Sequence, residues 1–220
     1  MKREIYPGRG KRKENKKKIF LAGGLCLCVL LALLAFWKGR RQNGVLLYPV
    51  QAREIPDMVY FMQRDSRWSG EHLGEARDTM ASSGCLVCCL AAGLDMQAGN
   101  RNLDFFMTAG QLNEVFSEKN VYTESGAVIW GKVPEALPGT TCYVADTVTE
   151  KEIDSLLADG IFPVVKVRMG GVGAWHWVLL TGTDESGYVC MDPMGEAEEP
   201  VPLSEFQDRV YSVRAVYFTE

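Results

Sequence analysis

Residues 82–94 read SSGCLVCCLAAGL, and every residue from Cys85 to Leu94 is apolar or small. A surface helix would carry polar residues along one side, so this run predicts a helix that is buried on all sides. Ser83 and Gly84 precede the run and are residue types that favour a helix start. We therefore expect Cys85 to stand at the first position of a buried helix.

The rest of the chain predicts helices first and strands later. Thr108 with Gln111, and Thr149 with Glu152, have the spacing of a capping box, which predicts helices that begin near residues 109 and 150. Segments rich in Val, Tyr, Trp and Phe predict strands at residues 162–168, 175–182, 188–191 and 210–218. The polar sequence Asp184-Glu185-Ser186-Gly187 predicts a hairpin turn between two of them. Helices in the first half and antiparallel strands in the second predict an α+β domain.

The N-terminal part predicts a membrane anchor. Residues 19–37 contain no charged side chain, and residues 2–18 contain nine Lys and Arg. As a helix the uncharged run would extend about 28 Å, close to the thickness of a bilayer core. We expect a basic cytoplasmic tail at 1–18, a transmembrane helix at 19–37, a linker at 38–57 and one domain at 58–220.

The charge distribution around this run predicts its orientation. Basic residues are more frequent before the run than after it, which favours a cytoplasmic N-terminus and an extracytoplasmic C-terminal domain at the cell membrane. A cleaved signal peptide is the alternative, but the run is long for one and no small-x-small cleavage pattern closes it.

The two parts of the chain differ in charge. Residues 1–41 carry twelve basic and two acidic side chains, and residues 42–220 carry twelve and twenty-six. An acidic domain lacks the clustered Lys and Arg that bind phosphates, which argues against a nucleic-acid partner. The basic tail suits anionic lipid headgroups. For the domain, basic peptides or cell-wall polymers are the hypothesis that the overall charge favours.

Three residues predict nucleophilic chemistry. The N-terminus of a helix favours a thiolate at Cys85, because the helix dipole places partial positive charge there. A thiolate needs a base, and the chain has only two histidines, of which His176 lies on a predicted strand between Trp175 and Trp177. Asp192 follows the next predicted strand and would orient the ring. A simple hairpin register places Asp192 opposite Leu179, so a bulge or loop must bring it to His176.

These residues resemble, in order, a known family. The motifs are Met62-Gln63-Arg64-Asp65-Ser66-Arg67-Trp68, Ser82-Ser83-Gly84-Cys85, Trp175-His176-Trp177 and Asp192-Pro193. Together they are similar to the papain-like cysteine peptidases of family thirty-nine, the bacteriocin-processing type, and to their stand-alone relatives. The resemblance covers about residues 58–218. The chain departs from it after the nucleophile, where Leu86-Val87-Cys88-Cys89 replaces the usual Gly-Pro-Thr.

The resemblance implies a papain-like fold and a site. Cys85 would be the nucleophile, His176 the general base and acid, and Asp192 the residue that orients His176. The Cys85 N–H and the Gln63 side chain would form the oxyanion hole. The substrate would be a peptide or protein, with no metal or organic cofactor, and the oligomeric state stays open.

Two other functions remain open. Cys85-x-x-Cys88 at a helix start fits a thiol–disulfide oxidoreductase, although the strand that should precede such a motif is missing. A papain-like domain without activity that binds peptides or proteins is the other. The disulfides are open as well: Cys142 and Cys190 could pair, or Cys88 or Cys89 could form a regulatory disulfide with Cys85.

Overall fold

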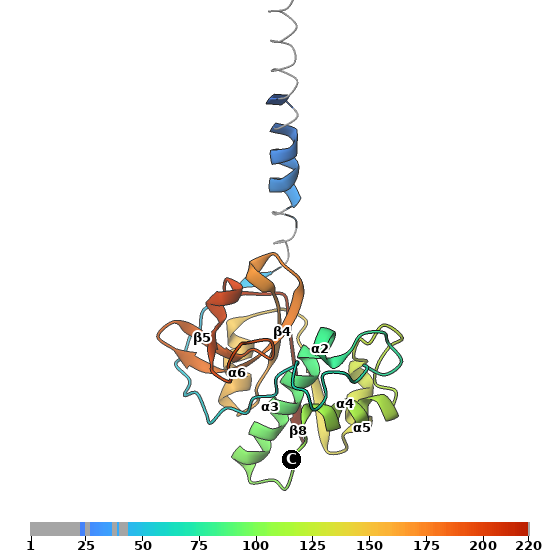
Figure 1. Cartoon of the computed structure of the whole chain (residues 1–220). Coiled ribbons are helices and arrows are strands. Elements are labelled where there is room, and N and C mark those ends of the chain that lie inside the picture. Colours follow the sequence, from blue (N-terminus) through green and yellow to red (C-terminus); the bar gives the residue numbers. More distant parts are fainter. Residues whose placement is uncertain (1–22, 25–26, 37–38, 40–43, 220) are drawn as a thin grey trace, which may run out of the picture. The chain divides into compact units, whose positions relative to one another are not determined.

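Helix α3 (Cys85–Arg101) forms the centre of the domain in the computed structural model, which describes residues 23–24, 27–36, 39 and 44–219. Its residues from Val87 to Ala98 are buried, apart from Asp95. The helix contacts the strands on one side and helix α4 on the other (Figure 1). A Cβ at Gly93 would lie 3.1 Å from the Leu179 side chain, so the small residues of α3 let it approach the sheet closely. The predicted buried helix is confirmed, and it extends seven residues beyond Leu94.

The helices begin where their caps predict. Helix α4 (Ala109–Glu118) follows Thr108 and has a complete capping box with Gln111. Helix α6 (Glu150–Ala158) follows Thr149, whose hydroxyl accepts a hydrogen bond from the Glu152 N–H. The remaining short helical segments are α2 (Met80–Ser83), η1 (Trp130–Lys132), α5 (Val133–Ala136), η2 (Met169–Gly171) and η3 (Leu203–Phe206).

The second half of the chain forms a six-stranded sheet in the order β2-β8-β3-β4-β5-β6. The strands are β2 (Thr140–Val144), β3 (Val164–Arg168), β4 (Trp175–Asp184), β5 (Gly187–Met191), β6 (Val201–Pro202) and β8 (Ser212–Phe218). Every pairing within the described residues is antiparallel. The predicted α+β class is therefore confirmed. The sequence analysis missed β2 and β6, which lie at the two edges of the sheet.

The segment before residue 58 is part of the domain. Strand β1 (Val45–Leu46) pairs with β7 (Arg209–Val210), and the next residue, Leu47, is only 1% exposed. We expected the domain to begin at residue 58, whereas the compact unit is Asn43–Glu220. The expected linker was extended and contained proline, and only contacts with distant parts of the chain show that it is packed.

This segment, which we call the strap (residues 44–56), also crosses the β4–β5 hairpin. The Arg53 N–H donates to the Thr183 hydroxyl at 2.7 Å, and the Thr183 N–H donates back to the Arg53 carbonyl at 3.0 Å. A Cβ at the neighbouring Gly182 would lie 2.8 Å from the Glu54 carbonyl, so only glycine fits there. The strap therefore lies directly on the hairpin.

The N-terminal unit, Met1–Gln42, is separate from the domain. Residues 23–24 and 27–36 are helical, and the large apolar side chains from Leu27 to Phe36 are all more than half exposed. Among the described residues no helix is both long and apolar enough to cross a membrane. The tail expected at 1–18 and parts of the span expected at 19–37 lie outside the described residues.

We predict that Leu47→Ala lowers the free energy of unfolding by about 2–5 kcal/mol, because it removes a buried side chain and leaves a cavity. Leu46 is 44% exposed and is the matched control, for which we expect a change below about 1 kcal/mol. Urea denaturation of the full chain, followed by tryptophan fluorescence, measures both. Equal effects of the two substitutions would show that the strap does not contribute to the core.

Candidate active site

Cys85 is the first residue of α3, and the turn before it requires glycine. A Cβ at Gly84 would lie 2.6 Å from the Met80 carbonyl oxygen and 2.8 Å from the Met80 Cα. Helix α2 therefore runs into α3 through a junction too tight for any side chain. Cys85 is partly exposed, whereas Cys88 and Cys89 are completely buried. At the start of α3, one thiol is therefore accessible to solvent and two are buried in the core.

His176 lies on β4 and is 1% exposed. Its Nε2 atom is 2.6 Å from Oδ1 of Asp192, whose side chain is 10% exposed. The same carboxylate oxygen accepts a hydrogen bond from the Met194 N–H at 2.7 Å, which holds the carboxylate in place. Because a carboxylate accepts, Nε2 carries a hydrogen, and Nδ1 is the nitrogen left for another partner.

A bulge in the β4–β5 hairpin determines how the two residues meet. Near the turn Gly182 pairs with Val189, but the next pair along the hairpin is Leu180 with Cys190. Thr181 is therefore an extra residue on β4. Its hydroxyl donates to the Val189 carbonyl at 3.3 Å, which gives the extra residue a hydrogen-bond partner inside the sheet.

The bulge moves Asp192 to the face of the sheet that carries His176. In the register of the turn Asp192 would lie opposite Leu179, whose side chain points to the other face. With the extra residue, Leu179 pairs with Met191 and Asp192 follows at the level of Val178. Val178 and His176 are two residues apart and share a face, so Asp192 becomes a diagonal neighbour of His176. This bulge is the irregularity that the sequence analysis expected between His176 and Asp192.

Burial and the neighbouring groups act on the pKa of His176 in opposite directions. Burial lowers this pKa, but the hydrogen bonds to Asp192 and Cys85 and the negative charges of both raise it, to about 9. His176 is therefore protonated at neutral pH. Since this pKa lies above the usual value of about 6.5, the stabilisation from protonated His176 is complete below pH 6.5 and is lost as the pH rises through 9.

Gln63 connects the loops on either side of this pair. Its Nε2 donates to the Ala81 carbonyl at 2.7 Å, four residues before Cys85, and its backbone N–H donates to the Pro193 carbonyl at 2.8 Å, next to Asp192. The side chain is 1% exposed, and its Oε1 has no hydrogen-bond partner. An amide nitrogen has two hydrogens, so one remains available beside the bond to Ala81.

In the other cysteines of the domain, burial disfavours the reactive thiolate form. Burial raises the pKa values of Cys88, Cys89 and Cys190 far above the usual value, and it raises that of Cys142 to about 11. All described cysteines are free thiols. Cys142 on β2 and Cys190 on β5 are separated by three strands of the sheet, which is too far for a disulfide.

The topology also bears on the redox alternative. A thioredoxin-type motif follows a strand of a sheet with parallel pairs, whereas residues 62–79 before α2 form turns and one isolated bridge. In the part of the chain that the structure describes, no group of three or more His, Cys, Asp or Glu side chains is placed to hold a metal ion.

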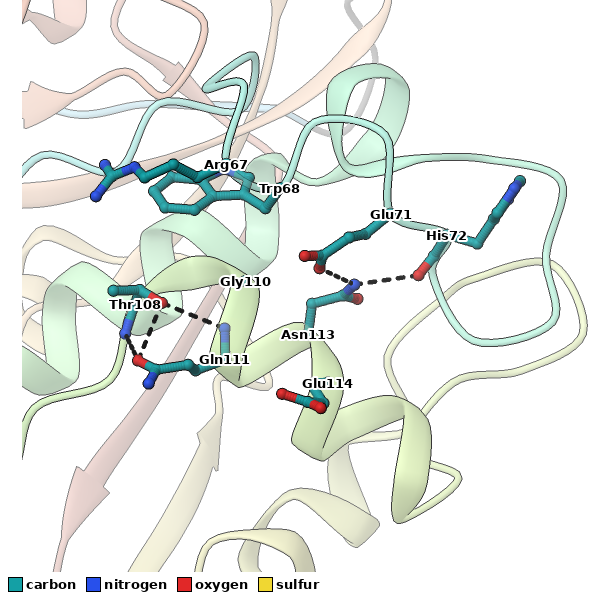
Figure 2. A pocket seen from close by; sticks show the side chains of 9 residues that line it. All are labelled: Arg67, Trp68, Glu71, His72, Thr108, Gly110, Gln111, Asn113 and Glu114. Atoms are coloured by element: carbon teal, nitrogen blue, oxygen red, sulfur yellow. Dashed lines mark hydrogen bonds between the residues drawn. The ribbon is translucent and has the colours of Figure 1, made fainter.

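A pocket of about 540 Å³ is lined by other residues than Cys85, His176, Asp192 and Gln63 (Figure 2). Its lining is Arg67, Trp68, Glu71, His72, Thr108, Gly110, Gln111, Asn113 and Glu114. The Asn113 amide donates to Glu71, and Thr108 and Gln111 are bound to each other in the cap of α4. The pocket contains no thiol beside a histidine, so it is not where we place the chemistry.

The sequence analysis missed the residues that hold the site together. The carbonyls of Ala81 and Pro193 hold Gln63, and backbone groups leave no signal in a sequence. The bulge at Thr181 did leave a signal in the sequence, because a simple hairpin register places Asp192 one residue away from the position that reaches His176. The sequence analysis also assigned no place to Trp130, whose ring centroid lies 6.5 Å from that of Trp177, next to His176.

We predict that Asp192→Asn lowers the pKa of His176 by about one to two pH units, because the carboxylate charge is removed. In a His72→Gln background His176 is the only histidine, so NMR of its ring protons follows the titration directly. Asp184→Asn, in the exposed hairpin turn, is the control and should leave the pKa near 9. A pKa near 6.5 in the parent protein would contradict the observed geometry.

Comparisons with known proteins gave the following results. No protein-family model matches the chain. No curated protein matches it either. Among solved structures, it is similar to a crystal structure from Bacillus anthracis described as a C39-like peptidase, with a TM-score of 0.45 and 13% sequence identity. The similarity covers 77% of this chain and 98% of that chain.

Proposed function

We propose that the chain is a cysteine peptidase of the papain-like type, in which Cys85, His176 and Asp192 act together. The observation that carries the proposal is the short bond between His176 and Asp192 beside the thiol that opens α3. A nucleophile, a base and a residue that orients the base are the three parts that acyl transfer needs. Neither the redox function nor a binding function gives these three residues a joint role.

The reaction would begin with Cys85 as a thiolate and His176 as an imidazolium. The thiolate attacks the carbonyl carbon of the peptide bond, and the negative oxygen is stabilised by the N–H groups at the start of α3 and by the second hydrogen of the Gln63 amide. His176 then gives its proton to the leaving amine. Water, deprotonated by His176, attacks the thioester, and the acid product leaves. Asp192 holds the ring in the orientation that serves both steps.

We further propose that residues 19–37 anchor the chain in the cell membrane, with the domain on the extracytoplasmic side. The support is the uncharged run of nineteen residues and the basic residues before it. A hydrolase that is held at a membrane meets its substrates at that surface.

The function is tested by the rate at which iodoacetamide modifies Cys85 in the full chain. At pH 6–7 we expect Cys85 to react at least tenfold faster than Cys142, the other partly exposed thiol of the domain, with mass spectrometry locating the label. We expect His176→Ala to slow the reaction at Cys85 by tenfold or more, because the imidazolium no longer stabilises the thiolate. Equal rates with and without His176 would remove the basis of the proposal.

The same preparation tests the oxyanion hole. We expect p-nitrophenyl acetate to acylate the protein, Cys85→Ala to abolish this, and Gln63→Ala to lower the rate by about a hundredfold with little change in KM. Gln63→Glu keeps the shape but loses the donor, so it separates hydrogen bonding from packing. An unchanged rate in both variants would exclude Gln63 from the reaction.

The anchor is tested by adding a membrane-impermeant maleimide to intact cells that express the chain. We expect Cys85 to be labelled without cell lysis, because the domain lies outside. A cysteine placed in the tail, as Lys11→Cys, is the control and should react only after lysis. The opposite pattern would reverse the proposed orientation, and recovery of the protein without its first 37 residues would indicate a cleaved signal peptide.

A further inference from the structure

Three cations and three tryptophans gather on one face of the sheet. Lys166 pairs with Trp177 across β3 and β4, and Arg168 pairs with Trp175. Side chains that face each other in an antiparallel pair lie on the same side of the sheet, so these four side chains share a surface. Arg214, which lies opposite Val164 on β8, is on that side as well. We call Lys166, Arg168, Arg214, Trp130, Trp175 and Trp177 the basic aromatic patch.

The aromatic rings hold the cations in place. The Arg168 guanidinium carbon is 3.6 Å from the centre of the Trp175 ring, and the Lys166 Nζ is 4.6 Å from the same ring and 5.9 Å from that of Trp177. At the other end, the Arg214 guanidinium carbon is 6.0 Å from the Trp130 ring. Cations stacked on rings keep their charge available for a ligand and lose less freedom when one binds.

Among the residues that the structure describes, no carboxylate forms an ion pair with these cations. The ion pairs within the described residues are Arg67 with Asp65 and His176 with Asp192, and neither involves the patch. The two arginines of the patch each donate from Nη1 to a backbone carbonyl, while their buried Nε atoms have no hydrogen-bond partner. A buried donor without an acceptor costs free energy.

The electrostatic effects agree with this proximity. Burial lowers the pKa of Lys166, and the positive charges of Arg168 and Arg214 lower it further. A negative charge on Cys85 acts in the opposite direction and raises the pKa of the same lysine. Positive charge is concentrated here in a domain that is acidic overall.

The patch adjoins the proposed catalytic pair. Trp177 follows His176 on β4, and its carbonyl accepts a hydrogen bond from the Cys89 thiol at 3.5 Å, one turn after Cys85. Elsewhere in the domain, the exposed Glu198 and Glu199 act on Tyr60, whose pKa is raised first by burial and then by these two carboxylates.

We propose that the basic aromatic patch binds an acidic segment of the peptide substrate, with Asp or Glu carboxylates on Lys166, Arg168 and Arg214 and the adjacent side chains against the tryptophan rings. This rests on the proposed peptidase function and adds a substrate class to it. The preference is opposite to the one that the overall charge of the domain favours, because the charges nearest to the nucleophile determine which residues lie beside it.

Binding is measured in the full chain with Cys85→Ala, which prevents turnover. The probes are fluorescein-labelled octapeptides in which glycine alternates with glutamate, glutamine or lysine, and fluorescence polarisation gives each Kd. We expect the glutamate peptide to bind about tenfold more tightly than the glutamine peptide, as three ion pairs to half-buried cations allow, and to lose this advantage at high salt. The triple variant Lys166→Gln, Arg168→Gln, Arg214→Gln should abolish the preference.

The matched control removes the same charge from exposed positions elsewhere, as Arg77→Gln, Lys119→Gln and Lys151→Gln, and should keep the preference. Thermal unfolding compares the stability of the two triple variants. If the patch variant does not fold, Lys166→Glu alone serves instead and should reduce the preference for the glutamate peptide, because it replaces one of the three positive charges with a negative one.

Three results would overturn the proposal: equal binding of the glutamate and glutamine peptides, loss of the preference in the matched control, or equally tight binding of a single-stranded oligonucleotide, which would indicate a general anion surface. Because binding is measured without Cys85, its outcome is independent of the alkylation test. Acidic preference with a failed alkylation test would leave a peptide-binding module. A successful alkylation test without the preference would leave a peptidase with another specificity.

Discussion

The close packing of α3 is the constraint on which the rest of the domain depends. A helix without a polar face must be covered on all sides, and here the strands cover one side and α4 the other. Gly93 permits the approach to the sheet, and Gly84 permits the tight entry from α2. These two close contacts determine where α3 lies and where it begins. The position of Cys85, the first residue of α3, follows from them.

The proposed chemistry joins elements that are far apart in the sequence. Cys85 comes from the helical half, His176 from the middle of the sheet, and Asp192 from the loop after β5. Gln63 connects them, because it is bonded to the Ala81 carbonyl on one side and to the Pro193 carbonyl on the other. The site therefore forms only when both halves are in place, and local order in either half is insufficient.

Local signals explain what could be predicted from the sequence. The caps at Thr108 and Thr149, the turn at 184–187 and the apolar run of α3 are each encoded within a few residues. The strap looked like a linker because its partners, such as Thr183, lie more than a hundred residues away. Gln63 was suggested by family resemblance alone. The basic aromatic patch depends on which residues of β3 and β4 face each other, and composition does not contain that information.

The extra residue at Thr181 has a consequence for evolution. Insertions in the turn at 184–187 leave the strand pairing unchanged, so homologues can vary in length there. A single-residue insertion or deletion within β4 or β5 between His176 and Asp192 would move the carboxylate to the opposite face of the sheet. Substitutions in these strands can accumulate one at a time, whereas length changes must come in compensating pairs. In this hairpin, the number of residues from His176 to the turn and from the turn to Asp192 should therefore persist longer than the identity of those residues.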